Sequence, residues 1–400
     1  MAKRKALLTL FGGRSCLPAA LSLLYEKPEI VVAISSIESY RDLPLLKQAI
    51  DTYQKKHHFS CQLETPNGID AFEIAAIQHV CESIVAQYRD MDWLFDVTGA
   101  TSLMTLSAYE ASKTHRIQSE NAVRCWYLNT AQSRVIPLLG EGCNESIFNI
   151  EVDDYVTAYG RDLVVGKLED QREYSEQYWL LFAQMLGKNP QSAALMKRVM
   201  SKIADRPGKQ SPKLYAINGF SAETHSLLKE AQQVGLLSQL SSNKGSTISF
   251  QLTYMQDQFL NGAWLEAYVW DVARNIWDEN RGKALFDDCQ WNQKIIDGHS
   301  KNELDVAATY KAQLLIAECK TGEEESFSSE TLYKLDSVAN ILGGRFVGRL
   351  LITSILSKKP SEDFLAQAKS RRIVVVTGDA LPGLAATLKQ EAISPTFPRI

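Results

Sequence analysis

The chain has 400 residues, of which 45% are hydrophobic and 22% are charged, and a formal net charge of −4 at pH 7. This length predicts about two or three domains, and the composition is ordinary for a soluble globular protein. The charge excludes a global basic field, so any contact with nucleic acid must use local patches. The 7 cysteines form no C-x-x-C pair, which argues against a zinc ribbon or a disulfide framework. Without a recognisable signal peptide or a bilayer-spanning segment, we expect a cytoplasmic protein with no membrane partner.

Apolar runs alternate with helical patterns along the N-terminal third of the chain. We expect strands at residues 5–11, 30–35 and 91–97. We expect helices near residues 17–25, 42–55 and 69–88, and after residue 102. Repeated strand–helix units of this kind predict an α/β domain with a mostly parallel, doubly wound, Rossmann-like sheet. Ligands of such sheets bind at the carboxyl ends of the strands, near helix N-termini.

Two strand-to-helix turns of this region are rich in glycine and hydroxyl residues. They are Gly12-Gly13-Arg14-Ser15 and Thr98-Gly99-Ala100-Thr101-Ser102. Glycines let backbone N–H groups approach a phosphate, and hydroxyls add hydrogen bonds. The chain has no G-x-G-x-x-G motif and no Walker lysine, which disfavours a dinucleotide dehydrogenase or an NTPase. The alternative is that both turns are structural, with Ser and Thr as helix N-caps.

The middle of the chain predicts a small connector. Residues 150–170 are acidic and are expected to form an irregular linker, followed by helices at residues 174–186 and 193–203. Ser221 is expected to cap a third helix, and the turn at residues 242–245 before TISFQL is typical of a winged-helix-like ending. The most basic stretch of the chain also lies here, at Lys197, Arg198, Lys202, Arg206, Lys209 and Lys213. It can contact a nucleic-acid backbone or form the solvated face of a spacer domain.

Two acids and a lysine lie close together in the C-terminal part. Asp305 closes a polar stretch that we interpret as a loop, and residues 312–319, AQLLIAEC, predict a buried strand leading into Lys320. Because alternate side chains of a strand share a face, Glu318 and Lys320 point the same way and Cys319 points into apolar packing. Two carboxylates can hold a hard divalent cation, and an ammonium can position the attacking water or steady a phosphate. The alternative is a solvated strand end with a surface ion pair.

Two helices can add charged groups to this site. The first opens near Gly262 with Leu265 and Val269 on its apolar face, and it would deliver Glu266 as a third acid. The second, TLYKLDSVANILGG, carries Lys334, which can reach a phosphate or remain a solvated helix lysine. The sequence from Arg371, RRIVVVTGDALPGLAATL, predicts a closing strand, turn and helix.

These residues resemble the PD-(D/E)xK nuclease superfamily, which has the restriction-endonuclease-like α/β fold. In that pattern a helix Glu, an Asp and a Glu-x-Lys converge on one metal site, and they match Glu266, Asp305, Glu318 and Lys320 here, with Leu304 in place of the Pro. The resemblance implies Mg²⁺ or Mn²⁺ held by Asp305 and Glu318, supported by Glu266. It also implies that Lys320 orients or helps to deprotonate the water, and that cleavage leaves a 5′-phosphate and a 3′-hydroxyl.

The order of the parts resembles the CARF-domain ancillary nucleases of type III CRISPR defence. The resemblance divides the chain into a CARF-like sensor (residues 1–149), a winged-helix-like connector (residues 150–254) and a nuclease (residues 255–400). It implies antiviral defence by a homodimer that binds a cyclic oligoadenylate, usually cyclic tetra-adenylate. The matching sensing residues are Gly12, Gly13, Arg14, Ser15, Thr98, Gly99, Thr101 and Ser102. The family turn often reads T-G-G-T-K, whereas this chain has Ala100 and Ser102 at the second Gly and the Lys.

Three functions remain open at this point. The first is a cyclic-oligoadenylate-activated nuclease that cuts DNA or RNA, single- or double-stranded, with little sequence preference. The second is a ligand-responsive winged-helix transcriptional regulator with an inactive nuclease fold. The third is an enzyme that turns over nucleotides at the turn of residues 98–102. Retention of Asp305, Glu318 and Lys320 together favours the first.

Overall fold

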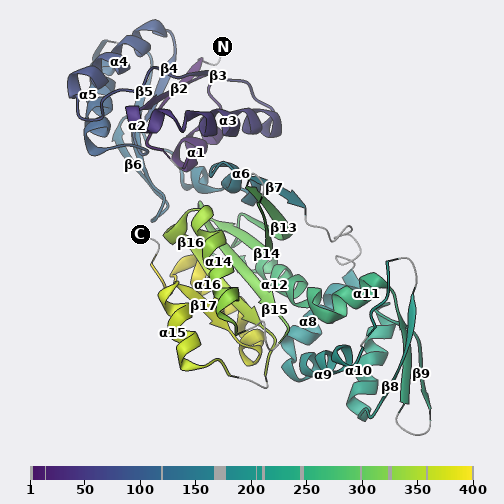
Figure 1. The fold of residues 1–400 in the computed structure, drawn as a ribbon. Coiled ribbons are helices and arrows are strands. Elements are labelled where there is room, and N and C mark those ends of the chain that lie inside the picture. Colours follow the sequence, from purple (N-terminus) through teal and green to yellow (C-terminus); the bar gives the residue numbers. More distant parts are fainter. Residues whose placement is uncertain are drawn as a thin grey trace.

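The computed structural model describes residues 3–13, 15–118, 120–165, 177–203, 205–209, 212–243, 247–297, 300–322, 327–356 and 359–398. Arg14, one of the expected sensing residues, lies outside these ranges. The chain folds into an N-terminal sheet domain, a connector and a C-terminal sheet domain (Figure 1). The C-terminal domain lies between the other two in space, although it follows both in the sequence (Figure 1).

The N-terminal domain is built on a six-stranded sheet with the strand order β3-β2-β1-β4-β5-β6. Its strands are β1 (Lys5–Phe11), β2 (Ile30–Ser35), β3 (Gln62–Glu64), β4 (Asp92–Asp96), β5 (Val123–Asn129) and β6 (Arg134–Leu139). Neighbouring strands run parallel from β3 to β5, and β6 pairs antiparallel with β5. The expected doubly wound sheet is confirmed. Because β1 and β4 are parallel neighbours, their carboxyl ends bring the two glycine-containing turns to one edge of the sheet.

Helices cover both faces of this sheet. They are α1 (Leu17–Glu26), α2 (Ile37–Tyr40), α3 (Leu43–His57), α4 (Ile74–Gln87) and α5 (Ser102–Gln118). Helices α1 and α3 pack into one apolar core and α4 and α5 into another. Helix α4 begins at Ile74 rather than near residue 69, because Ile69 forms a bridge with Ser36 and the Asp70 carboxylate accepts a hydrogen bond from the Phe72 N–H.

The expected irregular linker is wrong for residues 152–165. After η1 (Glu145–Phe148) come helix α6 (Val152–Thr157) and strand β7 (Asp162–Val165), and β7 pairs with the C-terminal sheet. The acidic residues that suggested a solvated linker are paired instead. Asp154 is buried, and its two carboxylate oxygens lie 2.9 Å from Lys56 Nζ and 3.0 Å from His57 Nε2 at the end of α3.

The connector combines helices with a three-stranded antiparallel sheet in the order β8-β10-β9. Its elements are α8 (Gln177–Lys188), α9 (Pro190–Ser201), β8 (Lys213–Asn218), α10 (Ala222–Gln233), β9 (Ser238–Asn243), β10 (Thr247–Leu252) and α11 (Tyr254–Gln258). Ser221 caps α10 by accepting a hydrogen bond from the Thr224 N–H, as expected. Helix α10 is followed by β9 and β10, which pair antiparallel, and residues 244 and 245 of the expected turn lie outside the described residues. The winged-helix-like connector stays a prediction.

The C-terminal domain is built on a six-stranded sheet with the order β17-β16-β15-β14-β13-β7. Its other elements are η2, a π-helical turn (Phe259–Ala263), α12 (Trp264–Asn275), β11 (Trp277–Asp278), β12 (Lys283–Ala284), β13 (Asp288–Asp297), β14 (Ser300–Tyr310), β15 (Gln313–Lys320), α14 (Ser329–Ile341), η3 (Gly344–Phe346), β16 (Val347–Thr353), α15 (Glu362–Ser370), β17 (Ile373–Val376), η4 (Gly378–Gly383) and α16 (Leu384–Ile393). Strands β15, β16 and β17 are parallel, whereas β13, β14 and β15 form an antiparallel meander.

Two apolar cores cross the boundaries between the parts. One contains residues of α1 and α3 together with Ile316 of β15 and Leu335 of α14. The other contains residues of α8 and α10 together with Leu265 of α12 and Ile352 of β16. Continuous buried apolar surface is what stabilises a fixed arrangement of domains. The C-terminal domain is therefore packed against both neighbours rather than tethered to them.

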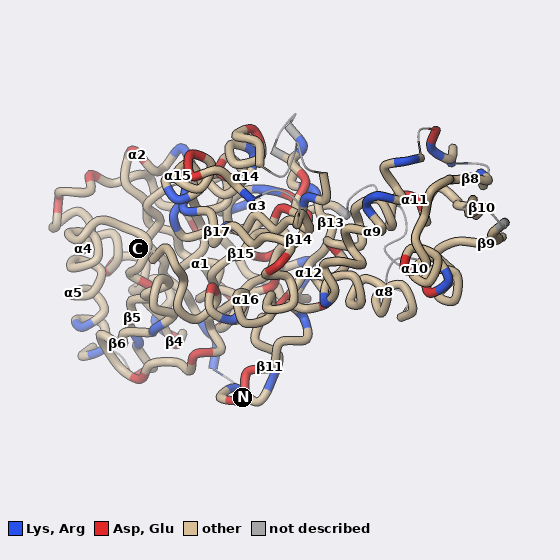
Figure 2. The backbone as a smooth tube through the Cα atoms, turned by 90° about the horizontal axis from the view of Figure 1, so that it is seen from below, with Lys and Arg blue, Asp and Glu red and all other residues tan. Residues whose placement is uncertain are grey.

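The charges give no domain a single sign. Figure 2 shows Lys and Arg positions interspersed with Asp and Glu positions along the described backbone, and the formal net charge is −4. Within the described residues, no helix combines the length and the apolar character needed to cross a bilayer.

Candidate functional site

Asp305 and Glu318 lie opposite each other on neighbouring strands. Strands β14 and β15 are antiparallel, and the pair Val306–Ala317 brings the preceding Asp305 level with the following Glu318. Both side chains are buried, and Asp305 Oδ2 accepts a hydrogen bond of 2.7 Å from the Cys319 N–H. Asp305 thus stands within a strand, and the interpretation of its segment as a loop is wrong. The hairpin that joins the two strands fixes the relative position of the two carboxylates.

Glu318 is held by two lysines. Its Oε1 lies 2.6 Å from Lys320 Nζ and 2.9 Å from Lys334 Nζ. The first contact confirms that Glu318 and Lys320 share a face of β15, as strand alternation requires. The second comes from α14, and the Lys334 side chain that makes it is still 41% exposed to solvent. The pair places two positive charges against one buried carboxylate.

Glu266 reaches the same site from α12. Its Oε2 accepts a hydrogen bond of 3.0 Å from Trp291 Nε1 of β13, and the Trp291 ring stacks on Trp270 of α12 at 5.7 Å between centroids. An indole N–H donates only, so it holds the carboxylate in one orientation. Helix and strand are therefore joined at the point where the third acid enters the site.

Burial and neighbouring negative charge raise the pKa of two of the acids, Glu266 and Asp305. Burial and the charge of Asp305 hold the pKa of Glu266 well above its usual range. Burial and the charge of Glu318 raise the pKa of Asp305 to about 7. Burial lowers the pKa of Lys320, but attraction by Glu318 and Asp305 outweighs it, so the net shift is upward and the ammonium stays charged. Repulsion of this kind is what a bound cation relieves.

The described residues contain no group of three His, Cys, Asp or Glu side chains arranged to hold a metal ion. Each acid has a protein donor instead: Trp291 for Glu266, the Cys319 N–H for Asp305, and the two lysines for Glu318. The donor set nevertheless fits a hard divalent cation, since it consists of three carboxylates. Burial, together with neighbouring negative charge, raises the pKa of Glu266 and Asp305.

The raised pKa of Asp305 predicts how stability depends on pH in metal-free protein. The ordinary pKa of this carboxyl is 3.8, and the folded value is about 7, so between these pH values the folded state holds a proton that the unfolded state releases. Stability therefore falls as pH rises through this window, and Glu266 acts in the same direction. We expect Asp305→Asn to stabilise the protein at pH 8, by on the order of 1–3 kcal/mol, and to have little effect at pH 4. Urea unfolding in EDTA at both pH values measures this, and an equal effect at both would contradict it.

Glu266 and Asp305 open onto a cleft of about 760 Å³ between the connector and the C-terminal sheet, whereas buried Glu318 is not among its lining residues. Glu266, Asp305, Lys320 and Lys334 line it. So do further residues, in particular Lys209, Tyr254, Asn261, Asn292 and Lys294. Of these residues, Lys209 belongs to the basic stretch for which the sequence predicted a possible contact with nucleic acid. Lys294 and Asn292 carry no motif, and only their places on β13, opposite the strand that carries Asp305, bring them to the cleft.

The expected sensing turns lie in contact with each other. A Cβ atom on Gly12 would overlap the carbonyl oxygen of Gly99, and a Cβ on Gly99 would overlap that of Leu10. The adjoining hydroxyls have structural partners. Thr98 Oγ1 donates to buried Asp96 and accepts from the Leu128 N–H at 2.8 Å. The structural alternative therefore holds for Thr98, whose hydroxyl is already engaged on both sides.

Other members of the two turns cap helices. Ser15 Oγ accepts from the Leu17 N–H at 3.2 Å, and Thr101 Oγ1 accepts from the Met104 N–H at 3.3 Å. Gly13 adopts φ +124°, a conformation that favours glycine, and Ser102 is exposed. In their described residues, these turns thus offer a ligand mainly close backbone approach, together with the exposed residues Thr101 and Ser102.

A pocket of about 280 Å³ joins the sensing turns to the C-terminal domain. Gly12, Gly13, Ser15 and Gly99 line one side, and Gln313 lies on the other. The β14–β15 hairpin turn makes the connection: Ser133 Oγ donates to the Lys311 carbonyl at 2.8 Å, and Gln313 Nε2 donates to the Ala131 carbonyl at 2.9 Å. The same hairpin carries Asp305 and Glu318 along its two strands.

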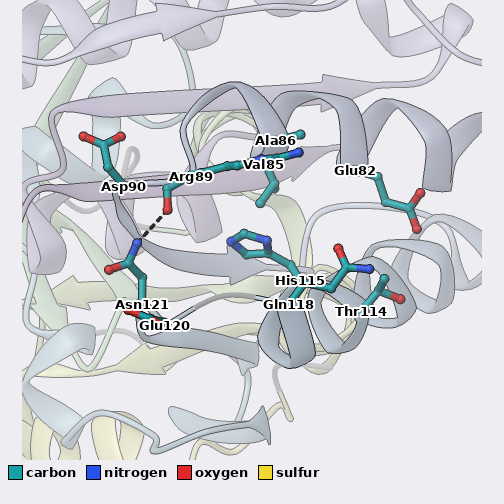
Figure 3. A pocket seen from close by; sticks show the side chains of 10 residues that line it. All are labelled: Glu82, Val85, Ala86, Arg89, Asp90, Thr114, His115, Gln118, Glu120 and Asn121. Atoms are coloured by element: carbon teal, nitrogen blue, oxygen red, sulfur yellow. Dashed lines mark hydrogen bonds between the residues drawn. The ribbon is translucent and has the colours of Figure 1, made fainter.

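A second pocket of the N-terminal domain lies away from these turns. It has a volume of about 600 Å³ and lies between α4 and α5, where His115 points towards the backbone of Arg89 (Figure 3). Its lining residues Asp90 and Asn121 directly precede β4 and β5, which places it at the amino ends of the strands. No expected sensing residue lines it, and ligands of such sheets bind at the opposite edge.

Comparisons with known proteins agree with this architecture. Residues 254–394 match the family described as Card1-like, endonuclease domain. The fold resembles protein VC1899 from Vibrio cholerae, with a TM-score of 0.76, 18% identity and coverage of 98% of this chain and 99% of that chain. It also resembles Can2 from Sulfobacillus thermosulfidooxidans in complex with cyclic tetra-adenylate, with a TM-score of 0.68, 19% identity and coverage of 96% and 97%. No curated protein matches the chain by sequence.

A third structure shares part of its length with the chain. It is a type III CRISPR defence DNA nuclease activated by cyclic oligoadenylate, with a TM-score of 0.51, 13% identity and coverage of 88% of this chain and 46% of that chain. The expected Rossmann-like domain joined to an endonuclease domain is thus confirmed, and residues 254–394 form a Card1-like endonuclease domain.

Proposed function

We propose that this protein is a metal-dependent endonuclease of type III CRISPR defence, activated by a cyclic oligoadenylate, most simply cyclic tetra-adenylate. The observation that carries the proposal is the convergence of Glu266, Asp305 and Lys320 in a lysine-lined cleft, with buried Glu318 paired to Lys320 behind its wall. It lies within the part of the chain that matches an endonuclease domain. Buried acids with raised pKa values in a cleft are typical of a catalytic site.

Asp305, Glu318 and Glu266 would hold Mg²⁺ or Mn²⁺. A cation bound there activates water and stabilises negative charge on a phosphoryl oxygen. Metal binding requires ionised carboxylates, so it would draw the proton from Asp305 and free Glu318 from its lysines. The oxygen-only donor set agrees with a hard cation rather than zinc.

The lysines supply fixed positive charge. Because the pKa of Lys320 is raised, its ammonium is suited to orient the nucleophilic water and to bind a phosphate oxygen rather than to remove a proton. Lys334 approaches from α14, and Lys209 and Lys294 lie further along the cleft. Lysines along a groove bind the phosphate backbone without reading bases, which agrees with weak sequence preference for DNA or RNA.

The sensing function rests on the edge of the N-terminal sheet. Gly12, Gly13, Ser15, Gly99, Thr101 and Ser102 would contact the ring. Arg14 stands between Gly13 and Ser15 in the sequence and lies outside the described residues. The similar Can2 structure contains cyclic tetra-adenylate, which supports a ligand of this class. A symmetric ring can lie on a two-fold axis, so a homodimer would present the same turns to each half of it.

The β14–β15 hairpin is our proposed link between the two sites. Its turn contacts the sensor through Ser133 and Gln313 and borders the pocket of the sensing turns. Its strands position Asp305 and Glu318. A shift of the turn on ligand binding would move both carboxylates, which gives a physical form to the coupling free energy between sites.

Cleavage assays test the proposed function. We expect the full-length protein to cut single-stranded DNA, single-stranded RNA or supercoiled plasmid in Mn²⁺, at least about tenfold faster with cyclic tetra-adenylate, a coupling of about 1.4 kcal/mol. EDTA should abolish cleavage. Tight binding of the ring without cleavage of any of the three substrates would contradict this proposal and favour a ligand-responsive regulator.

A further inference from the structure

Asn292 is a buried amide that lines the catalytic cleft. Its side chain is 1% exposed, and it lies on β13 among the lining residues that include Asp305 and Lys320. Its Nδ2 has no hydrogen-bond partner among the described residues. Buried polar groups almost always have a partner, and an unmade donor destabilises the protein that contains it. The amide is therefore a buried donor in the wall of the cleft that no described protein acceptor uses.

The residue that carries this unpartnered amide also has a strained backbone conformation. Its φ is +49°, in the left-handed region that L residues rarely adopt, although Asn tolerates it better than most. The pairs Trp291–Val306 and Gln293–Leu304 on either side place Asn292 opposite Asp305. Leu304 and Val306 would share a face in a regular strand, yet they pack into different apolar cores. The β13–β14 ladder is thus distorted beside the proposed metal ligand.

This distortion lets two consecutive side chains serve one site. Neighbouring residues of a regular strand point to opposite faces. Here Trp291 Nε1 donates to Glu266, whose carboxylate lines the cleft, and Asn292 lines the same cleft. Strain retained at such a position indicates a functional use of the conformation.

We propose that Asn292 Nδ2 donates a hydrogen bond to a non-bridging oxygen of the phosphodiester that is cut, an inference that rests on the proposed function. An amide N–H₂ group only donates, so its complement is an oxygen such as the anionic oxygens that the cleft lysines attract. Because the amide N–H₂ group is neutral, it does not repel the cation expected at Asp305. It also does not replace that cation as the positive charge beside the carboxylate. A fixed, buried donor is also effective in stabilising charge on a reacting group.

The substitution Asn292→Gly separates a substrate contact from a structural role. Glycine adopts the left-handed conformation freely and removes the unpartnered donor. We expect the variant to keep or raise its Tm, by up to about 2–4 °C, while kcat/KM for the substrate of the wild type falls about 10²-fold. The matched control is His58→Gly in the sensor, at φ +52°, which should also keep or raise the Tm without changing kcat/KM.

Two results would overturn the inference about Asn292 and leave the proposed nuclease function standing. One is an Asn292→Gly protein with wild-type kcat/KM; the other is a loss of activity that merely follows a loss of Tm. If the wild type cuts no nucleic acid, the proposed function itself fails. Fluorescence anisotropy with short labelled DNA and RNA strands then decides on Asn292: binding at least about tenfold weaker in the variant supports a phosphate contact, and equal affinity rules it out.

Discussion

Glu318→Gln is expected to lower the cleavage rate about 10³-fold or more, because it removes a proposed metal ligand at nearly constant volume. Two effects on stability oppose each other in this variant. Lys320 and Lys334 lose the carboxylate that lies 2.6 and 2.9 Å away. In return, Asp305 no longer faces the charge that raises its pKa. We therefore expect a folded protein with a Tm within a few degrees of the wild type, measured alongside initial cleavage rates in Mn²⁺.

Glu330→Gln is the matched control for this experiment. Glu330 is an exposed glutamate in the first turn of α14, the helix that carries Lys334. The same chemical change there should leave the cleavage rate unchanged. Wild-type cleavage by the Glu318→Gln protein would show that the acids at this site hold no catalytic metal and would place the chemistry elsewhere.

Local periodicity carried much of the prediction from sequence. Strand alternation alone puts Glu318 and Lys320 on one face, and the contact between them is found in the structure. Alternating strand and helix patterns likewise predict the parallel sheet whose neighbours β1 and β4 bring Gly12 and Gly99 together. Both predictions rest on patterns within single segments, the alternation of one strand and the succession of strands and helices.

Local periodicity could not predict which distant segments pair with each other. Strand β7 pairs with β13 across more than a hundred positions, and its acidic surroundings suggested solvent because Lys56 and His57 lie far away in the sequence. The sequence around Lys334 is that of an ordinary helix lysine. Its contact with Glu318 follows only from the packing of α14 beside β15. Asn292 belongs to no motif, since its unusual conformation arises from the ladder with Asp305 rather than from its neighbours.

Charge and strain at the candidate site lower the stability of the ligand-free fold. Burial and neighbouring negative charge raise the pKa of Glu266 and Asp305, and the same site holds a strained asparagine and an unmade donor. Under the proposed function, a cation or a phosphate oxygen would relieve each of these. The two apolar cores that join the endonuclease domain to its neighbours provide the rigidity that such a site needs.

Gly12→Ala is expected to abolish the response to cyclic tetra-adenylate. A Cβ at this position would overlap the Gly99 carbonyl oxygen, so the two sensing turns must move apart, at a cost of about 1–3 kcal/mol. The movement changes the pocket bordered by the β14–β15 hairpin. Calorimetry should show ring binding weakened at least about tenfold. Cleavage without the ring should persist, because Glu318 and its lysines are not touched by the change.

Gly383→Ala provides the matched control, since a Cβ there would meet nothing within 4 Å and its φ is −92°. It should bind and respond to the ring like the wild type. If Gly12→Ala also binds the ring and is activated normally, the ligand does not depend on the packed glycine turns. The sensing site would then lie elsewhere, and the pocket between α4 and α5 would be the next place to examine.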